Sequence, residues 1–399
     1  MRRIFTLLIV LCGLCVVHGQ IVRCGADRID QYLPLLQEKR VGVVAHKASY
    51  IYTGVFKRKD VRRYNLNGNT HLVDFLAAQN INIECVFAPE HGFRGTADAG
   101  EKVNSSVDSR TGVPIWSLYS AKGRNLTDEQ LAAFDIMVVD MQDVGLRFYT
   151  YYITMLDVIN RCADFSRKVI ILDRPNPNGM YVDGPILDMK HKSGVGALPI
   201  PVVHGLTMGE IALMAIGEGW AKDADVEVVK CENYTHQSRY ILPISPSPNL
   251  KSQHAIYLYP STCLFEGTVC SLGRGTDAPF EMYGHPQMEG CSFKFTPRSV
   301  AGAKNPPLKD CLCYGVDLRG VDDEKIISEG FNLSYVIDAY NRTNLGEQFF
   351  TRFFEKLVGV DYIREMIMAG ASAEQIAARW KDEVEQFKVL RRKYLLYTE

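Results

Sequence analysis

Residues 81–95 read INIECVFAPEHGFRG, an apolar run that gives way at once to a carboxylate, an imidazole, a guanidinium and two glycines. The branched and apolar residues of 81–88 are typical of a strand buried on both faces of a parallel sheet. In open α/β sheets, ligands bind beyond the carboxyl ends of the strands. The stretch therefore predicts that Glu90 and His91 stand at the mouth of a crevice, although a capped turn with a solvated glutamate would also explain a polar residue there.

The same pattern, an apolar strand followed by polar residues, recurs along the first half of the chain. Strands are predicted at 41–45, 81–88, 136–139, 168–172 and 199–203, and helices at 29–38, 71–79 and 150–165. This alternation predicts an α/β fold with a Rossmann-like parallel sheet and helices on both faces. Right-handed crossovers place the strand ends along one rim. The polar residues expected there are His46, Glu90, Asp140, Gln142, Asp143, Asp173, Arg174 and His204.

Prolines interleaved with serines over 243–248 mark the predicted domain boundary. Beyond it, the pattern predicts a smaller α+β domain. Its strands are expected around 255–265, 291–295 and 311–318, and its helices at 333–340, 348–357, 362–368 and after a capping box at Ser372–Gln375. We therefore predict a signal peptide over 1–19, a Rossmann-like catalytic domain over 20–245, and an α+β C-terminal domain over 246–399 that completes the cleft.

The N-terminal segment indicates where the protein works. Two arginines, an apolar stretch over 4–17 and Gly19 are typical of a cleaved secretory signal, which predicts a periplasmic or secreted protein. No later stretch is long and apolar enough to span a membrane. The formal net charge of −1 gives no electrostatic case for nucleic acid. Because no G-x-G-x-x-G follows the first strand and no helix has H-x-x-x-H spacing, we predict neither a cofactor nor a metal.

A carboxylate-rich cleft without a cofactor fingerprint indicates hydrolysis. Glycoside hydrolysis commonly uses two carboxyl groups that flank one bond, and Glu90 is the first candidate. Glu210 lies three residues after Thr207 at the start of a helix, so a capping box explains it better than a site does. The candidates for the second group are Glu101, Asp140, Asp143 and Glu266.

The stretch 140–151 carries acid, amide, guanidinium and phenol groups between a predicted strand and a predicted helix. Sugar sites use such groups, with aromatic faces under the ring and forked donors on carboxylates. Tyr149 and Tyr151 are equally well explained as core residues. The predicted substrate-binding residues are Arg94, Asp140, Gln142, Asp143, Arg147, Tyr149, Tyr151, Arg174, His204 and Arg274.

Several motifs together resemble one family, the NamZ-like exo-β-N-acetylmuramidases. They are PEHGFRG at 89–95, the stretch 140–151, ILDRPNP at 171–177, HGLTMGE at 204–210, SPNL at 247–250, CLFEGT at 263–268 and GRGT at 273–276. The resemblance covers nearly all of the chain after the signal. It implies a Rossmann-like domain with a smaller second domain, and an activity that removes N-acetylmuramic acid from the non-reducing ends of peptidoglycan fragments.

The resemblance also implies roles for particular residues. Glu90 is similar to the family's catalytic acid, with His91 and Arg94 as neighbours, and Glu266 would reach in from the second domain. The chain departs from the family pattern at Val269 and Leu272, where family members often carry an amide and an acid. The lactyl carboxylate of N-acetylmuramic acid calls for a forked cation, and the available candidates are Arg147, Arg174 and Arg274.

Other functions stay open at this point. A cell-wall saccharide-binding protein without catalytic activity could use the same cleft. An ester or amide hydrolase is a third hypothesis, and the absence of a G-x-S-x-G motif disfavours it. If the protein is a glycoside hydrolase, the acetamido group of the sugar could itself serve as nucleophile.

Overall fold

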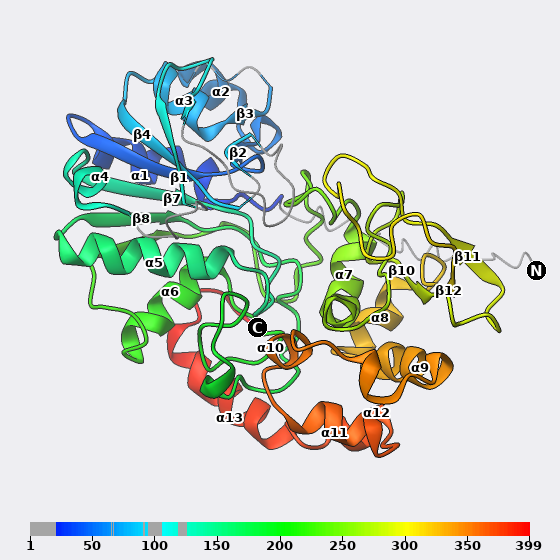
Figure 1. Ribbon diagram of the computed structural model, residues 1–399. Coiled ribbons are helices and arrows are strands. Elements are labelled where there is room, and N and C mark those ends of the chain that lie inside the picture. Colours follow the sequence, from blue (N-terminus) through cyan, green and yellow to red (C-terminus); the bar gives the residue numbers. More distant parts are fainter. Residues whose placement is uncertain (1–20, 65, 67, 91, 95–105, 119–125) are drawn as a thin grey trace, which may run out of the picture.

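The computed structural model describes residues 21–399 apart from 65, 67, 91, 95–105 and 119–125 (Figure 1). The predicted signal peptide, His91 and Glu101 lie outside the described residues. Among the described helices, none combines the length and the apolar character that a bilayer span requires. The nine cysteines of the described part, including Cys85 and Cys162 in the core, are unpaired.

A seven-stranded sheet forms the centre of the first half, and its strand order is β5-β6-β4-β1-β7-β8-β9. All neighbouring strands are parallel except β5, which runs antiparallel to β6. The strands are β1 (Arg40–Ala45), β4 (Asn82–Ala88), β5 (Ser106–Val107), β6 (Pro114–Ser117), β7 (Ile136–Asp140), β8 (Lys168–Leu172) and β9 (Val226–Val229). The predicted Rossmann-like parallel sheet is confirmed.

Helices cover both faces of this sheet, because alternate residues of its strands point to opposite sides. Val41 and Val43 of β1 pack into one apolar core, and Val44 packs into the other. The first core contains helices α1 (Ile29–Leu36) and α3 (Leu72–Ala78). The second contains α5 (Tyr151–Asp164) and α6 (Met208–Gly217), which run below the sheet in Figure 1. A further short helix, α2 (Arg58–Arg63), and the antiparallel pair of β2 (Tyr50–Ile51) and β3 (Thr70–His71) lie beside α3. Helix α4 (Asp128–Ala132) precedes β7.

The second half of the chain is α+β, as predicted. Its antiparallel sheet has the order β10-β12-β11, with strands β10 (Met282–His285), β11 (Phe293–Phe295) and β12 (Cys313–Asp317). Its helices are α7 (Gln253–Thr262), α8 (Asp323–Glu329), α9 (Ser334–Thr343), α10 (Phe354–Val358), α11 (Tyr362–Met368), α12 (Ala373–Ala377) and α13 (Lys381–Arg391). In Figure 1, α13 returns to lie under α6 of the first half.

Two of the predicted strands are wrong. Residues 199–203 add no strand to the sheet, since Val203 makes only isolated bridges to Leu146 and Asp183, and β9 takes the expected place beside β8. The prolines at 199 and 201 lack the N–H groups that a ladder needs. Residues 255–265 form α7 and the 3-10 turn that follows it. The run Ala255–Thr262 is buried on every side, so its apolar pattern does not distinguish helix from strand.

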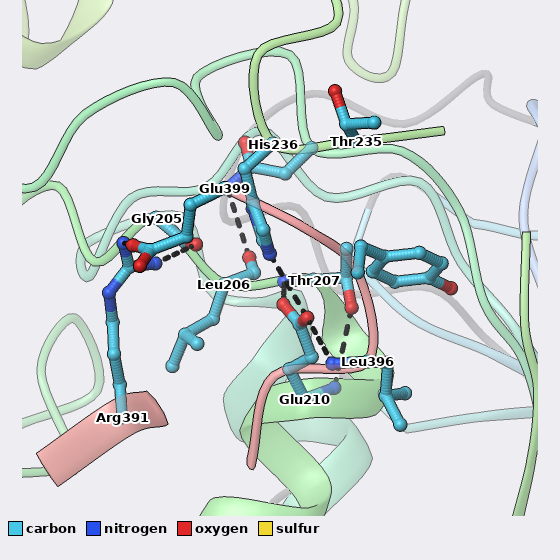
Figure 2. A network of polar contacts seen from close by, with 12 residues as sticks. Gly205, Leu206, Thr207, Glu210, Thr235, His236, Arg391, Leu396 and Glu399 are labelled. Atoms are coloured by element: carbon cyan, nitrogen blue, oxygen red, sulfur yellow. Dashed lines mark hydrogen bonds and ion pairs between the residues drawn. The ribbon is translucent and has the colours of Figure 1, made fainter. Parts of the chain in front are cut away.

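The end of the chain fastens the two halves together (Figure 2). Glu210 forms the predicted capping box with Thr207, and its Oε1 also accepts hydrogen bonds from His236 Nε2 at 3.0 Å and from Leu396 N at 2.8 Å. The hydroxyl of Tyr397 donates to Asp173 Oδ2 at 2.7 Å. This tail satisfies buried carboxylates at the carboxyl edge of the sheet, where an unpaired charge would be costly.

Candidate active site

A cavity of about 140 Å³ opens where the carboxyl edge of the central sheet meets the second half of the chain. Both halves supply its walls, so neither half contains the complete site. The lining residues are Glu90, Phe148, Tyr149, Thr150, Tyr151 and Val195 from the first half, and Ser247, Asn249, Leu250, Tyr259, Glu266, Arg274 and Phe280 from the second.

Glu90 reaches the cavity because β4 ends at Ala88 and Pro89 cannot continue the ladder. Its carboxylate Oε2 accepts a hydrogen bond from Thr150 Oγ1 at 3.0 Å, at the start of α5. Its main-chain oxygen accepts a bond from the Tyr151 hydroxyl at 3.3 Å. The side chain is half-buried, so it is held in position and still open to a ligand.

Arg94 holds the turn that presents Glu90. Its guanidinium donates to both oxygens of Asp108 and to both oxygens of Asp74, at 2.9 to 3.2 Å. Gly92 has φ = 78°, a left-handed conformation that glycine adopts without strain. Arg94 is not among the lining residues of the cavity. The structure therefore gives it the task of fixing the loop, in place of the predicted contact with substrate.

Aromatic rings make a continuous wall across the two halves. Tyr149 packs edge-on against Tyr151 at 5.0 Å and against Tyr259 at 6.1 Å, and Tyr259 packs against Phe280 at 4.8 Å. These centroid distances are those of favourable edge-to-face pairs. Burial raises the pKa of Tyr149 and of Tyr151 above the ordinary value, which keeps both phenols protonated. The wall offers apolar faces and hydroxyl donors, which suit a sugar ring.

Glu266 and Arg274 face each other on the C-terminal side of the cavity. Arg274 donates from Nε and Nη2 to the same oxygen, Glu266 Oε1, at 3.1 and 2.6 Å. Its guanidinium lies 5.0 Å from the ring centre of Phe280. Burial opposes the charge of Arg274, but the Glu266 carboxylate raises the pKa of the guanidinium above its usual value. Both side chains keep some exposure, 18% for Arg274 and 26% for Glu266.

Arg147 does not reach the cavity. Its side chain is fully buried and donates to four main-chain oxygens, those of Pro185, Ile200, Leu357 and Val358, at 2.7 to 2.9 Å. Burial lowers its pKa to about 10, so it remains a cation at neutral pH. The residue joins the two halves of the chain, and it has no forked face to offer a ligand.

Asp140 and Arg174 form a buried pair, and neither is among the residues that line the cavity. Arg174 donates from Nε to Asp140 Oδ1 at 2.6 Å and from Nη2 to Oδ2 at 2.9 Å, with exposed fractions of 1% and 0% for the two side chains. Although burial opposes its charge, Asp140 raises the pKa of Arg174. Asp140 ends β7 and Arg174 follows β8, so the pair joins adjacent strands and is not placed to hold a sugar.

Three more predicted site residues also bond within the protein. The amide of Gln142 donates to the main-chain oxygens of Asp143 and Pro175, both at 2.9 Å. Nδ1 of His204 accepts from the N–H of Leu206 at 3.1 Å, and burial lowers the pKa of His204 to about 3, so the ring is neutral. Asp143 accepts from Gly145 N at 2.8 Å. None of the three is among the residues that line the cavity, and His204 does not follow a strand of the sheet as predicted.

The buried Asp143 gives the fold a pH-dependent stability. Burial raises its pKa from 3.8 to about 7, against the lowering effect of the N–H of Gly145. The folded protein therefore holds this proton more tightly, so the contribution to stability is complete below about pH 4 and is lost as the pH rises to about 7. The unfolding free energy of the parent should therefore fall between pH 5 and pH 8. Asp143→Asn cannot ionise at this position, and we expect its unfolding free energy to fall by roughly 2–3 kcal/mol less over the same range.

Urea unfolding at the two pH values measures this difference, with Asp223→Asn at an exposed carboxyl as the control. Asp27 and Asp173, whose pKa values burial raises to about 6, are unchanged in both proteins and so do not affect the comparison. An identical pH dependence in Asp143→Asn and in the parent would contradict a buried, protonated Asp143.

Several lining residues were not predicted from the sequence. Thr150, Ser247, Asn249, Tyr259 and Phe280 all line the cavity. The sequence does contain an indication for two of them. Ser247 and Asn249 belong to the SPNL motif directly after the predicted domain boundary, and loop residues at such places often contribute to a site. The sequence gives no signal for Tyr259, because the apolar pattern of its segment predicts a strand.

A cavity with two carboxylates and an aromatic wall, at the carboxyl edge of a Rossmann-like sheet, is the arrangement expected of a glycoside hydrolase. Comparison with known proteins agrees. Family models for the N-terminal and C-terminal parts of the exo-β-N-acetylmuramidase NamZ match residues 41–254 and 257–397. The chain belongs to this family of glycosidases.

One curated relative is the peptidoglycan β-N-acetylmuramidase NamZ of Bacillus subtilis (strain 168), which is 34% identical over 394 residues, 94% of this chain and 91% of the relative. Two crystal structures of DUF1343 family proteins from Bacteroides fragilis NCTC 9343 share the fold. The first has a TM-score of 0.85 and 52% identity, and covers 95% of this chain and 99% of its own. The second has a TM-score of 0.76 and 26% identity, with 94% and 99% covered.

Proposed function

We propose that this protein is an exo-acting glycoside hydrolase that releases N-acetylmuramic acid from the non-reducing ends of peptidoglycan fragments, with Glu90 as the general acid. The family and the activity of the curated relative support the substrate class. The observation that carries the role of Glu90 is its place in the cavity, where Thr150 holds one carboxylate oxygen and aromatic rings surround it. His91, beside it in the sequence, belongs to the proposed catalytic set on sequence grounds.

The family supports action at a chain end, because the two family models that match the chain are those of an exo-β-N-acetylmuramidase. Cleavage is therefore proposed at the bond that joins the terminal residue to the next sugar.

In the proposed reaction, the bond between the anomeric carbon and the leaving oxygen breaks, and Glu90 gives its proton to that oxygen. The hydroxyl of a water molecule ends on the anomeric carbon, and its other proton restores the acid. Glu266 is the proposed second carboxylate, since it lines the same cavity and its Oε2 accepts no hydrogen bond from the described residues. The acetamido group of the sugar is the alternative nucleophile. If it attacks the anomeric carbon, Glu266→Gln should keep its activity.

Release of N-acetylmuramic acid from the disaccharide N-acetylmuramyl-β-1,4-N-acetylglucosamine tests the proposal. We expect turnover of this disaccharide and none of the trisaccharide that carries an additional N-acetylglucosamine on its non-reducing end. Proton NMR of the first-formed anomer then separates inversion from retention. Affinity for the disaccharide without product would favour a saccharide-binding protein instead, and internal cleavage of longer chains would exclude exo action.

We also propose that the protein works in the periplasm or is secreted. Peptidoglycan lies outside the cytoplasmic membrane, and residues 1–19 have the composition of a cleaved secretory signal. Sequencing the N-terminus of the protein recovered from the periplasm or the medium tests this, and a start at Met1 would contradict cleavage.

A further inference from the structure

We propose that Arg274 forms a carboxylate-binding subsite for the lactyl group of the terminal N-acetylmuramic acid, and that Glu266 positions it. The inference rests on the proposed function. N-acetylmuramic acid differs from N-acetylglucosamine by a lactyl ether on O3, which ends in a carboxylate. A site that selects the first sugar therefore needs a group that recognises this anion.

The contacts of the three candidate arginines single out one of them. Arg147 donates to four main-chain oxygens, and Arg174 is paired with Asp140 through Nε and Nη2. Neither lines the cavity. Among the described residues that line the cavity, Arg274 is the only one with a cationic side chain. A carboxylate brought into this space therefore finds its cationic partner there.

The geometry of Arg274 leaves a forked face available. A guanidinium has five N–H donors, and Arg274 uses one on Nε and one on Nη2 to bind Glu266. The two N–H groups of Nη1 and the second of Nη2 have no protein acceptor among the described residues. These are the groups that bind a carboxylate with two parallel hydrogen bonds. Glu266 and the ring of Phe280 fix the plane of the guanidinium, so little side-chain freedom is lost on binding.

The cavity wall around Arg274 strengthens its hydrogen bonds to a bound carboxylate. Much of the cavity wall is aromatic or aliphatic, and a hydrogen bond to a charged group is stronger where water is excluded. Because Arg274 is shared between Glu266 and the ligand, its contribution to the affinity for the lactyl carboxylate is moderate. We expect selectivity for the lactyl carboxylate of roughly 10- to 100-fold, the range of a single charge-assisted contact.

The experiment compares two chromogenic substrates, 4-nitrophenyl β-N-acetylmuramide and its methyl ester at the lactyl carboxyl. The parent enzyme is expected to prefer the acid by 10- to 100-fold in kcat/KM. In Arg274→Gln, we expect this preference to fall to within about twofold, mainly through a higher KM for the acid. Loss of the two bonds to Glu266 would lower kcat for both substrates alike and would leave the preference unchanged. A purely structural role of Arg274 would lower kcat/KM for both substrates equally and keep the preference of the parent. Either an unchanged preference in Arg274→Gln or a parent enzyme without preference would overturn the proposal.

Two further variants sharpen the result. Arg274→Lys keeps the charge without the fork, and we expect it to retain an intermediate preference. Arg319→Gln is the matched control, because Arg319 is also paired through two nitrogens with one carboxylate, Asp317, and lies 5.7 Å from a phenylalanine ring, yet is outside the cavity. It should keep the full preference of the parent.

Calorimetric binding of free N-acetylmuramic acid and of its methyl ester separates this inference from the proposed function. If the protein cleaves neither substrate, the proposed function fails, and a binding preference for the acid that Arg274→Gln removes would still support the subsite. Equal binding of the acid and the ester would overturn the subsite whatever the catalytic result.

Discussion

Replacing Glu90 by glutamine is expected to lower kcat on the muramyl disaccharide by about 10²- to 10⁴-fold, the usual contribution of a general acid. Glutamine has nearly the same shape and can still accept the hydrogen bond from Thr150 Oγ1. It has no proton to give to the leaving oxygen. The loss should therefore fall on kcat, with little change in the affinity for the disaccharide.

The leaving group provides the sharper test of this role. 4-Nitrophenolate departs without protonation, whereas the alkoxide of N-acetylglucosamine does not. We therefore expect Glu90→Gln to lose much less activity on 4-nitrophenyl β-N-acetylmuramide than on the disaccharide. Glu84→Gln is the control on the same strand, near its other end, where the carboxylate bonds only to Asn82 among the described contacts. Equal losses on both substrates, or unchanged turnover in a folded Glu90→Gln protein, would remove Glu90 from the role of acid.

Breaking the pair of Asp140 and Arg174 is expected to cost about 3–5 kcal/mol of unfolding free energy, because the remaining charge is left buried and unpaired. Asp140→Ala and Arg174→Met should each show this loss. The double variant Asp140→Ala/Arg174→Met should lose less than the sum, since it leaves neither charge behind. Denaturant unfolding followed by circular dichroism measures all three.

An exposed pair in the C-terminal half provides the comparison. Arg319 and Asp317 have side-chain exposures of 49% and 33%, and pairs of this kind contribute about 0–1 kcal/mol. Asp317→Ala should therefore change stability little. A loss in Asp140→Ala no larger than in Asp317→Ala would mean that water reaches the Arg174 pair and that its burial does not govern its energy.

The sequence predicts the centre of the fold well because the parallel strands are short apolar runs with polar ends. The runs 41–45 and 136–139 are buried along their whole length in β1 and β7, and short runs rich in valine and isoleucine favour strands buried on both faces. The prediction fails where burial is complete on all sides of a helix, as in α7. It also fails at 199–203, where proline removes the donors that an apolar run would otherwise use.

The site is less accessible to sequence reasoning, because a polar residue after a strand can face a cavity or the protein itself. Arg147 and Tyr149 are two positions apart in one motif, yet the first is buried against main-chain oxygens and the second lines the cavity. The choice depends on segments 185–200 and 357–358, which reach Arg147 from far along the chain. Only tertiary structure supplies that information, and it also separates Arg274 from the two arginines that share its chemistry.

The composition of the cavity makes the site a property of the whole fold. Glu90 comes from the first half, and Glu266 and Arg274 come from the second, so a fragment that carries either half alone has only part of the lining. The bonds of Leu396 to Glu210 and of Tyr397 to Asp173 join the two halves. Separation of the halves would therefore dismantle the cavity even if each half kept its own fold.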